Sequence, residues 1–142
     1  VGAALLDLQW GKLNPQSDVD VVEFEKNVAE SLGMPQEVQF RYRSPYFRHI
    51  FGSDGYASGY YTYLWAEVLD TDGFELFKEK GIFDPETAAS FKKNVLEAGG
   101  SEDPMQLYVK FRGREPKVDA LLRNRGLLED TKNGNLNIPG GK

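Results

Sequence analysis

The chain has 142 residues, of which 40% are hydrophobic and 27% are charged, and its formal net charge is −5. This length suits a single domain with a core of its own, and the acidic charge gives no general attraction to nucleic acid or anionic lipid. No apolar stretch approaches the ~20 residues that span a bilayer, and no secretory signal is visible. With no cysteine, and His49 as the one histidine, the sequence excludes disulfides and a His-Glu-x-x-His motif. We therefore expect neither nucleic-acid nor membrane partners, and no catalytic zinc site in this chain.

The first predicted element covers residues 4–10, where alternate apolar side chains can lie on one side of a strand. A short helix explains the same residues almost as well. Apolar residues at helical spacing then predict a helix over 21–32 that ends at Gly33. Residues 34–55 show little periodicity but carry five aromatic residues, so we expect a long ordered loop with a function.

Four further helices are predicted toward the carboxyl end, and the fold class is mainly α. Asp84-Pro85 is a typical helix start, and glycines mark the ends of the later helices. A polar, turn-rich tail covers residues 129–142. The four helices are expected over residues 56–80, from Asp84 to Gly99, from Ser101 to Gly113, and over 117–125.

Six of the seven tyrosines lie between residues 42 and 63, and the predicted helix over 56–80 divides some of them between two faces. One face is an ordinary core stripe, whereas side chains on the other face end in hydroxyl groups. Phenols gathered in this way favour a wet cleft, where they can donate to a ligand's oxygens. An aromatic core with satisfied hydroxyls remains the alternative. The core stripe is Tyr61, Leu64, Trp65 and Val68; the second stripe is Tyr56, Tyr60, Tyr63 and Glu67.

His49 lies between the two tyrosine-rich segments, and three arginines flank it. A lone histidine is either a structural hydrogen-bonding group or a ligand donor that titrates near neutral pH. Arginines are usually solvated or paired with acids, but a guanidinium is also a natural clamp for a carboxylate. The candidates for that clamp are Arg41, Arg43 and Arg48.

Several blocks of sequence, in order along the chain, resemble the thimet oligopeptidase family of zinc metallopeptidases, most closely its bacterial peptidyl-dipeptidase (dipeptidyl carboxypeptidase) branch. The match covers the chain to about residue 128. Its blocks are Tyr-Arg-Ser-Pro-Tyr-Phe-Arg-His at 42–49, Gly-Tyr-Ala-Ser-Gly-Tyr-Tyr-Thr-Tyr-Leu-Trp-Ala-Glu-Val at 55–68, Gly-Gly-Ser-Glu-Asp-Pro at 99–104, Phe-Arg-Gly-Arg-Glu-Pro-Lys at 111–117, Asp-Ala-Leu-Leu at 119–122 and Arg-Gly-Leu at 125–127.

The resemblance implies which residues form the site. In that family zinc is bound by a His-Glu-x-x-His helix and a later glutamate, both upstream of the matched region. The implied cofactor is therefore zinc in the full-length parent, with its ligands outside this chain. Tyr56 and Tyr63 are expected to be catalytic, as donors to the oxyanion, and His49 and Tyr60 to bind substrate. Arg43 is assigned to substrate binding on its chemistry alone.

The resemblance also implies the architecture and the partners. Residues 1–128 are expected to be the carboxyl-terminal helical part of a zincin-type catalytic domain, with a possible short strand near the N-terminus. The parent is expected to be a cytoplasmic peptidyl-dipeptidase or oligopeptidase acting on short peptides. This chain alone should be inactive and should associate with the missing N-terminal part of the same polypeptide. The alternative is a non-enzymatic, aromatic-rich peptide-binding domain.

Overall fold

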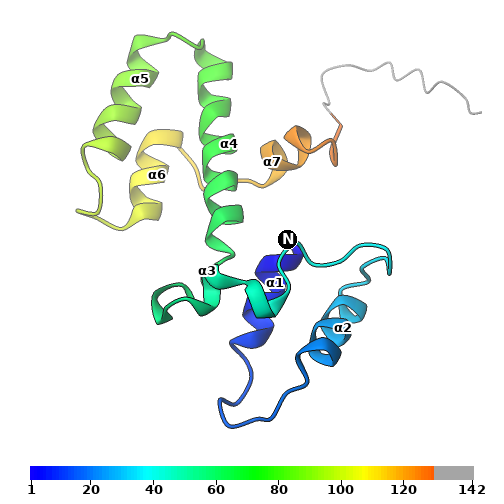
Figure 1. Cartoon of the computed structure of the whole chain (residues 1–142). Helices are drawn as coiled ribbons and strands as arrows, with labels where there is room; N and C mark the ends of the chain where they lie inside the picture. Colours follow the sequence, from blue (N-terminus) through cyan, green and yellow to red (C-terminus); the bar gives the residue numbers. More distant parts are fainter. Residues whose placement is uncertain (130–142) are drawn as a thin grey trace, which may run out of the picture. The chain divides into compact units, whose positions relative to one another are not determined.

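The structure, a computed structural model, describes residues 1–129. The chain divides into two compact units, Val1–Trp65 and Ala66–Lys142, and each is described by itself. Every regular element among residues 1–129 is helical (Figure 1), which confirms the mainly α fold class. The predicted tail falls almost wholly on residues 130–142, outside the described part of the chain.

Two helices and a series of short helical turns make up the first unit. Helices α1 (Gly2–Trp10) and α2 (Val21–Ser31) pack side by side (Figure 1). The predicted long loop is interrupted by three short turns of helix. These turns are η1 (Ser44–Tyr46), α3 (Arg48–Phe51) and η2 (Asp54–Tyr56).

The strand expected over residues 4–10 is wrong, because the segment forms helix α1. Alanine and leucine are among the strongest helix formers, and they fill residues 3–6. The amide of Leu5 already donates to the carbonyl of Val1 at 3.1 Å. A strand would also place Leu5 and Asp7 on the same face, whereas the helix buries Asp7 against a specific partner described below.

The core of the first unit lies between α1, α2 and the loop that follows α2. Leu6, Val28 and Phe40 are its buried centre. Trp10 packs on Phe24 with ring centroids 4.2 Å apart, which extends the core toward the end of α1. Burial of these side chains is the main force that holds α1 against α2.

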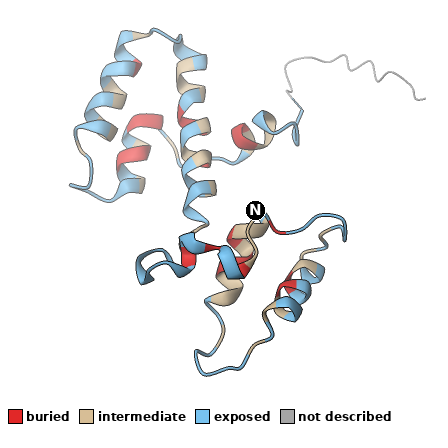
Figure 2. Cartoon of the chain, in the orientation of Figure 1, coloured by how far each residue is buried: buried red, intermediate tan, exposed pale blue. Residues whose placement is uncertain are grey.

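The second unit consists of most of α4 (Thr62–Lys80) and the helices that follow it. Asp84 caps α5 as predicted, and Asp103 caps α6 in the same way, because their carboxylates accept from the amides of Thr87 and Gln106. Buried residues concentrate on α6 and also occur on α7 (Figure 2). The elements after α4 are α5 (Pro85–Phe91), a π-helical turn η3 (Lys92–Leu96), α6 (Pro104–Arg112) and α7 (Asp119–Asn124).

Helix α4 begins at Thr62 and not at Tyr56, which corrects the predicted start. Residues 57–61 instead form a turn in which Ser58 has a φ of +58°, a left-handed conformation that cannot continue an α-helix. The predicted core stripe is correspondingly wrong for two of its members. Tyr61 and Trp65 are 49% and 45% exposed, whereas Val68 is buried.

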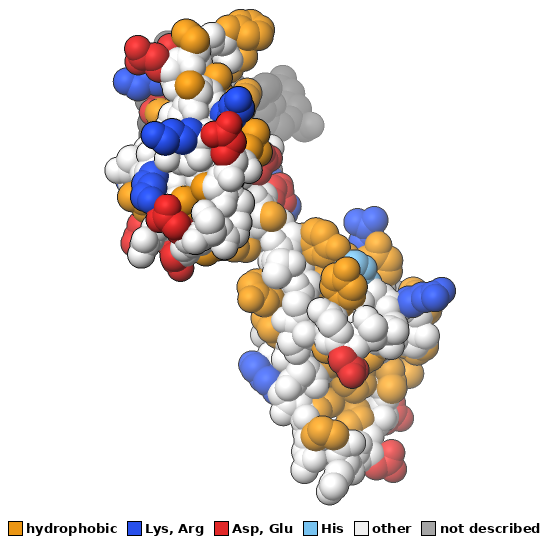
Figure 3. Space-filling model, turned by 90° about the vertical axis from the view of Figure 1, so that its left-hand side faces the viewer, with side chains coloured by type: hydrophobic (Ala, Val, Ile, Leu, Met, Phe, Trp, Pro, Cys, Tyr) orange, Lys and Arg blue, Asp and Glu red, His pale blue; other side chains and the backbone are white. Residues whose placement is uncertain are grey.

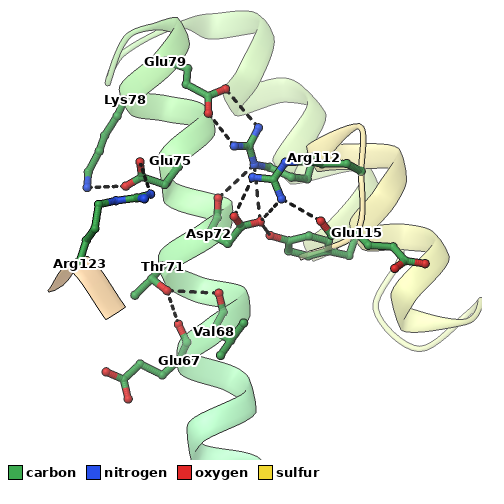
Figure 4. Close-up of polar contacts among 12 residues, drawn as sticks. Glu67, Val68, Thr71, Asp72, Glu75, Lys78, Glu79, Arg112, Glu115 and Arg123 are labelled. Atoms are coloured by element: carbon green, nitrogen blue, oxygen red, sulfur yellow. Dashed lines mark hydrogen bonds and ion pairs between the residues drawn. The ribbon is translucent and has the colours of Figure 1, made fainter. Parts of the chain in front are cut away.

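Acidic side chains along α4 pair with arginines from α6, from α7 and from the segments on either side of α7. The most buried of them is Asp72, which contacts both Arg112 and Arg114. Figure 4 shows Arg112 reaching Glu79 and Arg123 reaching Glu75. The pairs along α4 are Glu67–Arg125, Asp72–Arg114, Glu75–Arg123 and Glu79–Arg112.

Candidate functional site

The candidate site lies in the first unit and is built from three short segments. Helix α3 carries His49, turn η2 ends at Tyr56, and the turn before α4 carries Tyr60. The first turn of α4 adds Tyr63. We call these four residues the tyrosine–histidine cluster.

The rings of the cluster gather around His49. Its ring centroid lies 5.0 Å from that of Tyr56, 5.4 Å from Tyr60 and 5.6 Å from Tyr63. In Figure 3 the single histidine lies beside hydrophobic side chains on the visible face. The structure therefore brings four of the five predicted site residues together, although not on one helix face as the spacing implied.

A hydrogen bond joins the histidine to one of the phenols. Tyr63 Oη and His49 Nε2 are 3.1 Å apart. If Nε2 carries a proton, His49 donates to Tyr63 and the phenol proton stays available for a ligand oxygen. If Nε2 is unprotonated, Tyr63 donates to His49 instead. The histidine tautomer thus controls whether Tyr63 can donate elsewhere.

The cluster is open to ligands on one side and supported on the other. The side chains of Tyr56 and Tyr63 are 58% and 56% exposed, so their hydroxyls can be reached from solvent. Tyr60 lies deeper and packs edge-on against the buried ring of Phe47 at 5.0 Å. Burial, together with the neighbouring Tyr42, raises the pKa of Tyr60 above its usual value of 10.0, so this phenol remains a neutral donor.

A hollow of about 210 Å³ lies beside the cluster. It adds residues that the sequence did not single out for the site, of which Phe47 and Tyr42 stack at 5.0 Å and form its wall. Arg48 also lines the hollow, and it forms no ion pair within residues 1–129. Besides Arg48, the lining consists of Tyr42, Tyr46, Phe47, His49, Tyr60 and Tyr63.

Arg43, the remaining predicted site residue, lies elsewhere in the first unit. Its Nε pairs with Glu25 on α2, whose carboxylate also accepts from the amide of Ser44. Burial alone would raise the pKa of Glu25, but the hydrogen bonds from Ser44 and Arg43 outweigh burial and lower it. Arg43 lines a separate hollow beside α2, so the structure does not bring it to the cluster.

The turn that carries Tyr60 is fixed by a residue that sequence reasoning missed. The carboxylate of Asp7 accepts hydrogen bonds from the amides of Ser58 and Tyr60, each at 2.9 Å. Asp7 precedes these partners by more than 50 residues in the chain. The one signal in the sequence is an acidic residue inside an otherwise apolar segment.

The described residues do not fit a zinc site. Among residues 1–129, no group of three or more histidine, cysteine, aspartate or glutamate side chains is arranged to hold a metal ion. Four acids of α4 that could be mistaken for ligands, Glu67, Asp72, Glu75 and Glu79, are paired with arginines. A search of the same residues also finds no helix that is both long and apolar enough to cross a membrane.

Comparison with known proteins identifies the family. The model of peptidase family M3 matches residues 1–127. The chain belongs to peptidase family M3. This M3 chain is 44% identical to dipeptidyl carboxypeptidase of Escherichia coli over 130 residues, which is 89% of this chain and 19% of that protein.

Two further relatives are oligopeptidases. Over 87 residues, 61% of this chain and 13% of the relative, identity to oligopeptidase A of Haemophilus influenzae is 56%. Over 86 residues, 58% of this chain and 11% of the relative, identity to the organellar oligopeptidase A of Arabidopsis thaliana is 48%. The M3 chain thus spans less than a fifth of the length of the curated relatives it matches.

Proposed function

We propose that this M3 chain supplies the peptide-binding and oxyanion-stabilising surface of a peptidyl-dipeptidase or oligopeptidase that hydrolyses short peptides. The observation that carries the proposal is the 3.1 Å contact between Tyr63 Oη and His49 Nε2 beside an open hollow. Family membership supports the reaction class, because the relatives are named as oligopeptidases and dipeptidyl carboxypeptidases.

In this proposal the phenols act as hydrogen-bond donors. A peptide carbonyl gains negative charge during hydrolysis, and donors already aimed at that oxygen stabilise it most when the charge is largest. Tyr63 and Tyr56 have exposed hydroxyls suited to this role. His49 with a protonated Nε2 would keep the proton of Tyr63 free for the substrate. Tyr60 would form the floor of the binding surface.

In our proposal Arg48, and not Arg43, binds the carboxylate of the substrate. Arg43 is held by Glu25, so binding a substrate carboxylate would require breaking that pair. Arg48 lines the same hollow as His49 and Tyr63. A guanidinium in that position can bind the terminal carboxylate of a short peptide by donating two parallel hydrogen bonds to it.

The M3 family is zinc-dependent, and zinc would supply the Lewis acid for attack on the peptide bond. Because residues 1–129 hold no ligand set for it, we assign these residues binding and charge stabilisation only. We propose that residues 1–128 are the carboxyl-terminal portion of a catalytic domain whose remaining part provides the metal. We also propose that this remaining part is the chain's main partner and that the enzyme is cytoplasmic.

A second candidate function is peptide binding without catalysis. The observation that favours it is that the cluster and its hollow are built entirely within the first unit. Such a surface could bind a peptide without any metal. Aromatic side chains of this kind are common energetic centres of binding surfaces.

The two functions are separated by kinetics on a polypeptide that joins this chain to the zinc-binding part of the family. Tyr63→Phe should lower kcat by about 10²–10³-fold with little change in KM, because it removes one donor used mainly in the transition state. Tyr61→Phe is the matched control, since Tyr61 is 49% exposed and its hydroxyl forms no hydrogen bond within residues 1–129. Equal effects of the two substitutions would contradict the oxyanion role, and peptide binding without zinc-dependent cleavage would favour the second function.

A further inference from the structure

The buried carboxylate of Asp7 has no role yet in the proposed chemistry. Asp7 is 2% exposed on helix α1, and no ion pair joins it to a cation among residues 1–129. Its two oxygens are used separately. Oδ1 accepts from the amide of Ser58 and Oδ2 from the amide of Tyr60, both at 2.9 Å. Burying a carboxylate without a cation costs free energy unless backbone donors hydrogen-bond to it. In this protein the two amides of the turn provide those donors.

The turn that Asp7 holds contains an unfavourable backbone conformation. Ser58 adopts a φ of +58°, which few residues other than glycine take up. The turn connects η2, which ends at Tyr56, to α4, which begins at Thr62. Its position therefore sets where Tyr56 and Tyr60 lie relative to His49.

Helix α1 also approaches the same turn at its C-terminal end. A Cβ atom placed on Gly11 would lie 2.0 Å from Ser58 Oγ and 3.3 Å from Ser58 Cβ. Only a residue without a side chain permits this approach without a shift of Ser58. Asp7 and Gly11 lie four residues apart, on α1 and at its C-cap. Asp7 thus holds the 57–61 turn by hydrogen bonds, and Gly11 lets the helix pack closely against it.

We propose that Asp7 is a positioning residue for the tyrosine–histidine cluster: by binding the amides of Ser58 and Tyr60, it fixes the turn that aims the cluster's phenols. The consequence for peptide binding rests on the function proposed above. Both carboxylate oxygens are needed, because an asparagine would turn an NH₂ group toward one of the two amides. Asp7 acts through the turn and does not itself touch substrate.

The test is Asp7→Asn in the complete 142-residue chain, with Asp20→Asn as the matched control. Asp20 also binds two backbone amides, those of Val22 and Glu23, but at the start of α2. Asparagine caps a helix about as well as aspartate, so the control should be neutral. Two readouts are taken: nuclear Overhauser contacts from the His49 ring to the rings of Tyr56 and Tyr63, and the dissociation constant for tetraalanine.

We expect Asp7→Asn to lose the ring contacts and to weaken tetraalanine binding by about tenfold, while Asp20→Asn keeps both. Retained ring contacts in Asp7→Asn would overturn the inference. A wild-type chain that shows the ring contacts but does not bind tetraalanine would contradict only the proposed function. The two failures are therefore distinguishable.

A second pair of variants decides the matter if Asp7→Asn does not fold. Gly11→Ala should displace Ser58 and weaken the same ring contacts. Adding Ser58→Gly removes the two Ser58 atoms that would crowd the new methyl group and should restore the ring contacts. Ring contacts that stay unchanged in Gly11→Ala, or that are lost without rescue, would overturn the inference.

Discussion

The phenol of Tyr108 on α6 donates a 2.6 Å hydrogen bond to the carboxylate of Asp72 on α4. The same carboxylate accepts two hydrogen bonds from the guanidinium of Arg114, at 2.7 and 2.9 Å. Arg112 donates to the backbone carbonyl of Asp72 at 3.1 Å (Figure 4). Asp72 is 2% exposed, so one buried charge connects α4 with α6 and with the segment that follows it.

Substitution of Asp72 by asparagine should destabilise the second unit strongly. The change leaves Arg112 and Arg114 without their shared anion, and removing one partner of a buried ion pair costs roughly 3–5 kcal/mol. We expect Asp72→Asn to lower the free energy of unfolding by about 3 kcal/mol, because the side chain of Arg114 is 34% exposed and water offsets part of the loss. Urea unfolding followed by circular dichroism measures it. Asp70→Asn, at an exposed position on the same helix, is the control, and equal midpoints for the two variants would contradict the prediction.

Stability should also fall in acid because of Asp72. Burial acts to raise the pKa of this carboxyl, but the hydrogen bonds from Arg114 and Tyr108 outweigh burial and lower it below 3.8. The unfolded chain therefore binds this proton more readily, so the stabilisation is present above about pH 4 and is lost as the pH falls through the lowered pKa. Unfolding free energies measured across this range should show the loss, and Asp72→Asn should flatten the curve. An unchanged slope in the variant would exclude Asp72 as the cause.

An alkaline loss of stability should come from Tyr108. Burial and the hydrogen bond to Asp72 raise its pKa well above the usual 10.0. A phenol whose folded pKa is raised stabilises the fold fully below its unfolded pKa, and that contribution disappears as the pH rises above about 10. Tyr108→Phe should be less stable at neutral pH and should lose less between neutral pH and about pH 11. Parallel curves for the two proteins would contradict this assignment.

Gly113→Ala should cost about 1–2 kcal/mol, because Gly113 ends α6 with a φ of +81° that strains any residue with a Cβ. Nothing lies within 4 Å of the added methyl group, so the cost is purely conformational. Gly100 has equally open surroundings and its φ is not positive, which makes Gly100→Ala the matched control. Thermal unfolding of both variants measures the difference. A destabilisation of the same size in Gly100→Ala would point to some other cause.

Local signals in the sequence predicted much of the fold. Asp84 and Asp103 cap helices, and Gly33, Gly113 and Gly126 take positive φ values at helix ends. These features depend only on neighbouring residues. The start of α4 depends instead on the turn held by Asp7, a contact across more than 50 residues that periodicity cannot reveal.

In the candidate site, too, the sequence predicted some features and missed those that depend on distant contacts. Family resemblance pointed to His49, Tyr56, Tyr60 and Tyr63, and the structure places their rings together, although their chemical roles remain predictions. Helix spacing suggested a shared face, but a turn and two short helical segments bring the rings together instead. Arg43 could not be separated from Arg48 by sequence, because the partner that occupies it, Glu25, lies on another helix.

The arginine pairs along α4 bear on how the second unit responds to heat. The hydration of charged groups becomes less favourable as temperature rises, so the cost of withdrawing these ions from water falls, while apolar burial gains little more. Arg112 and Arg114 each engage a carboxylate through two N–H groups, on Glu79 and on Asp72. The connection between α4 and α6 should therefore retain its strength on heating better than apolar packing alone would.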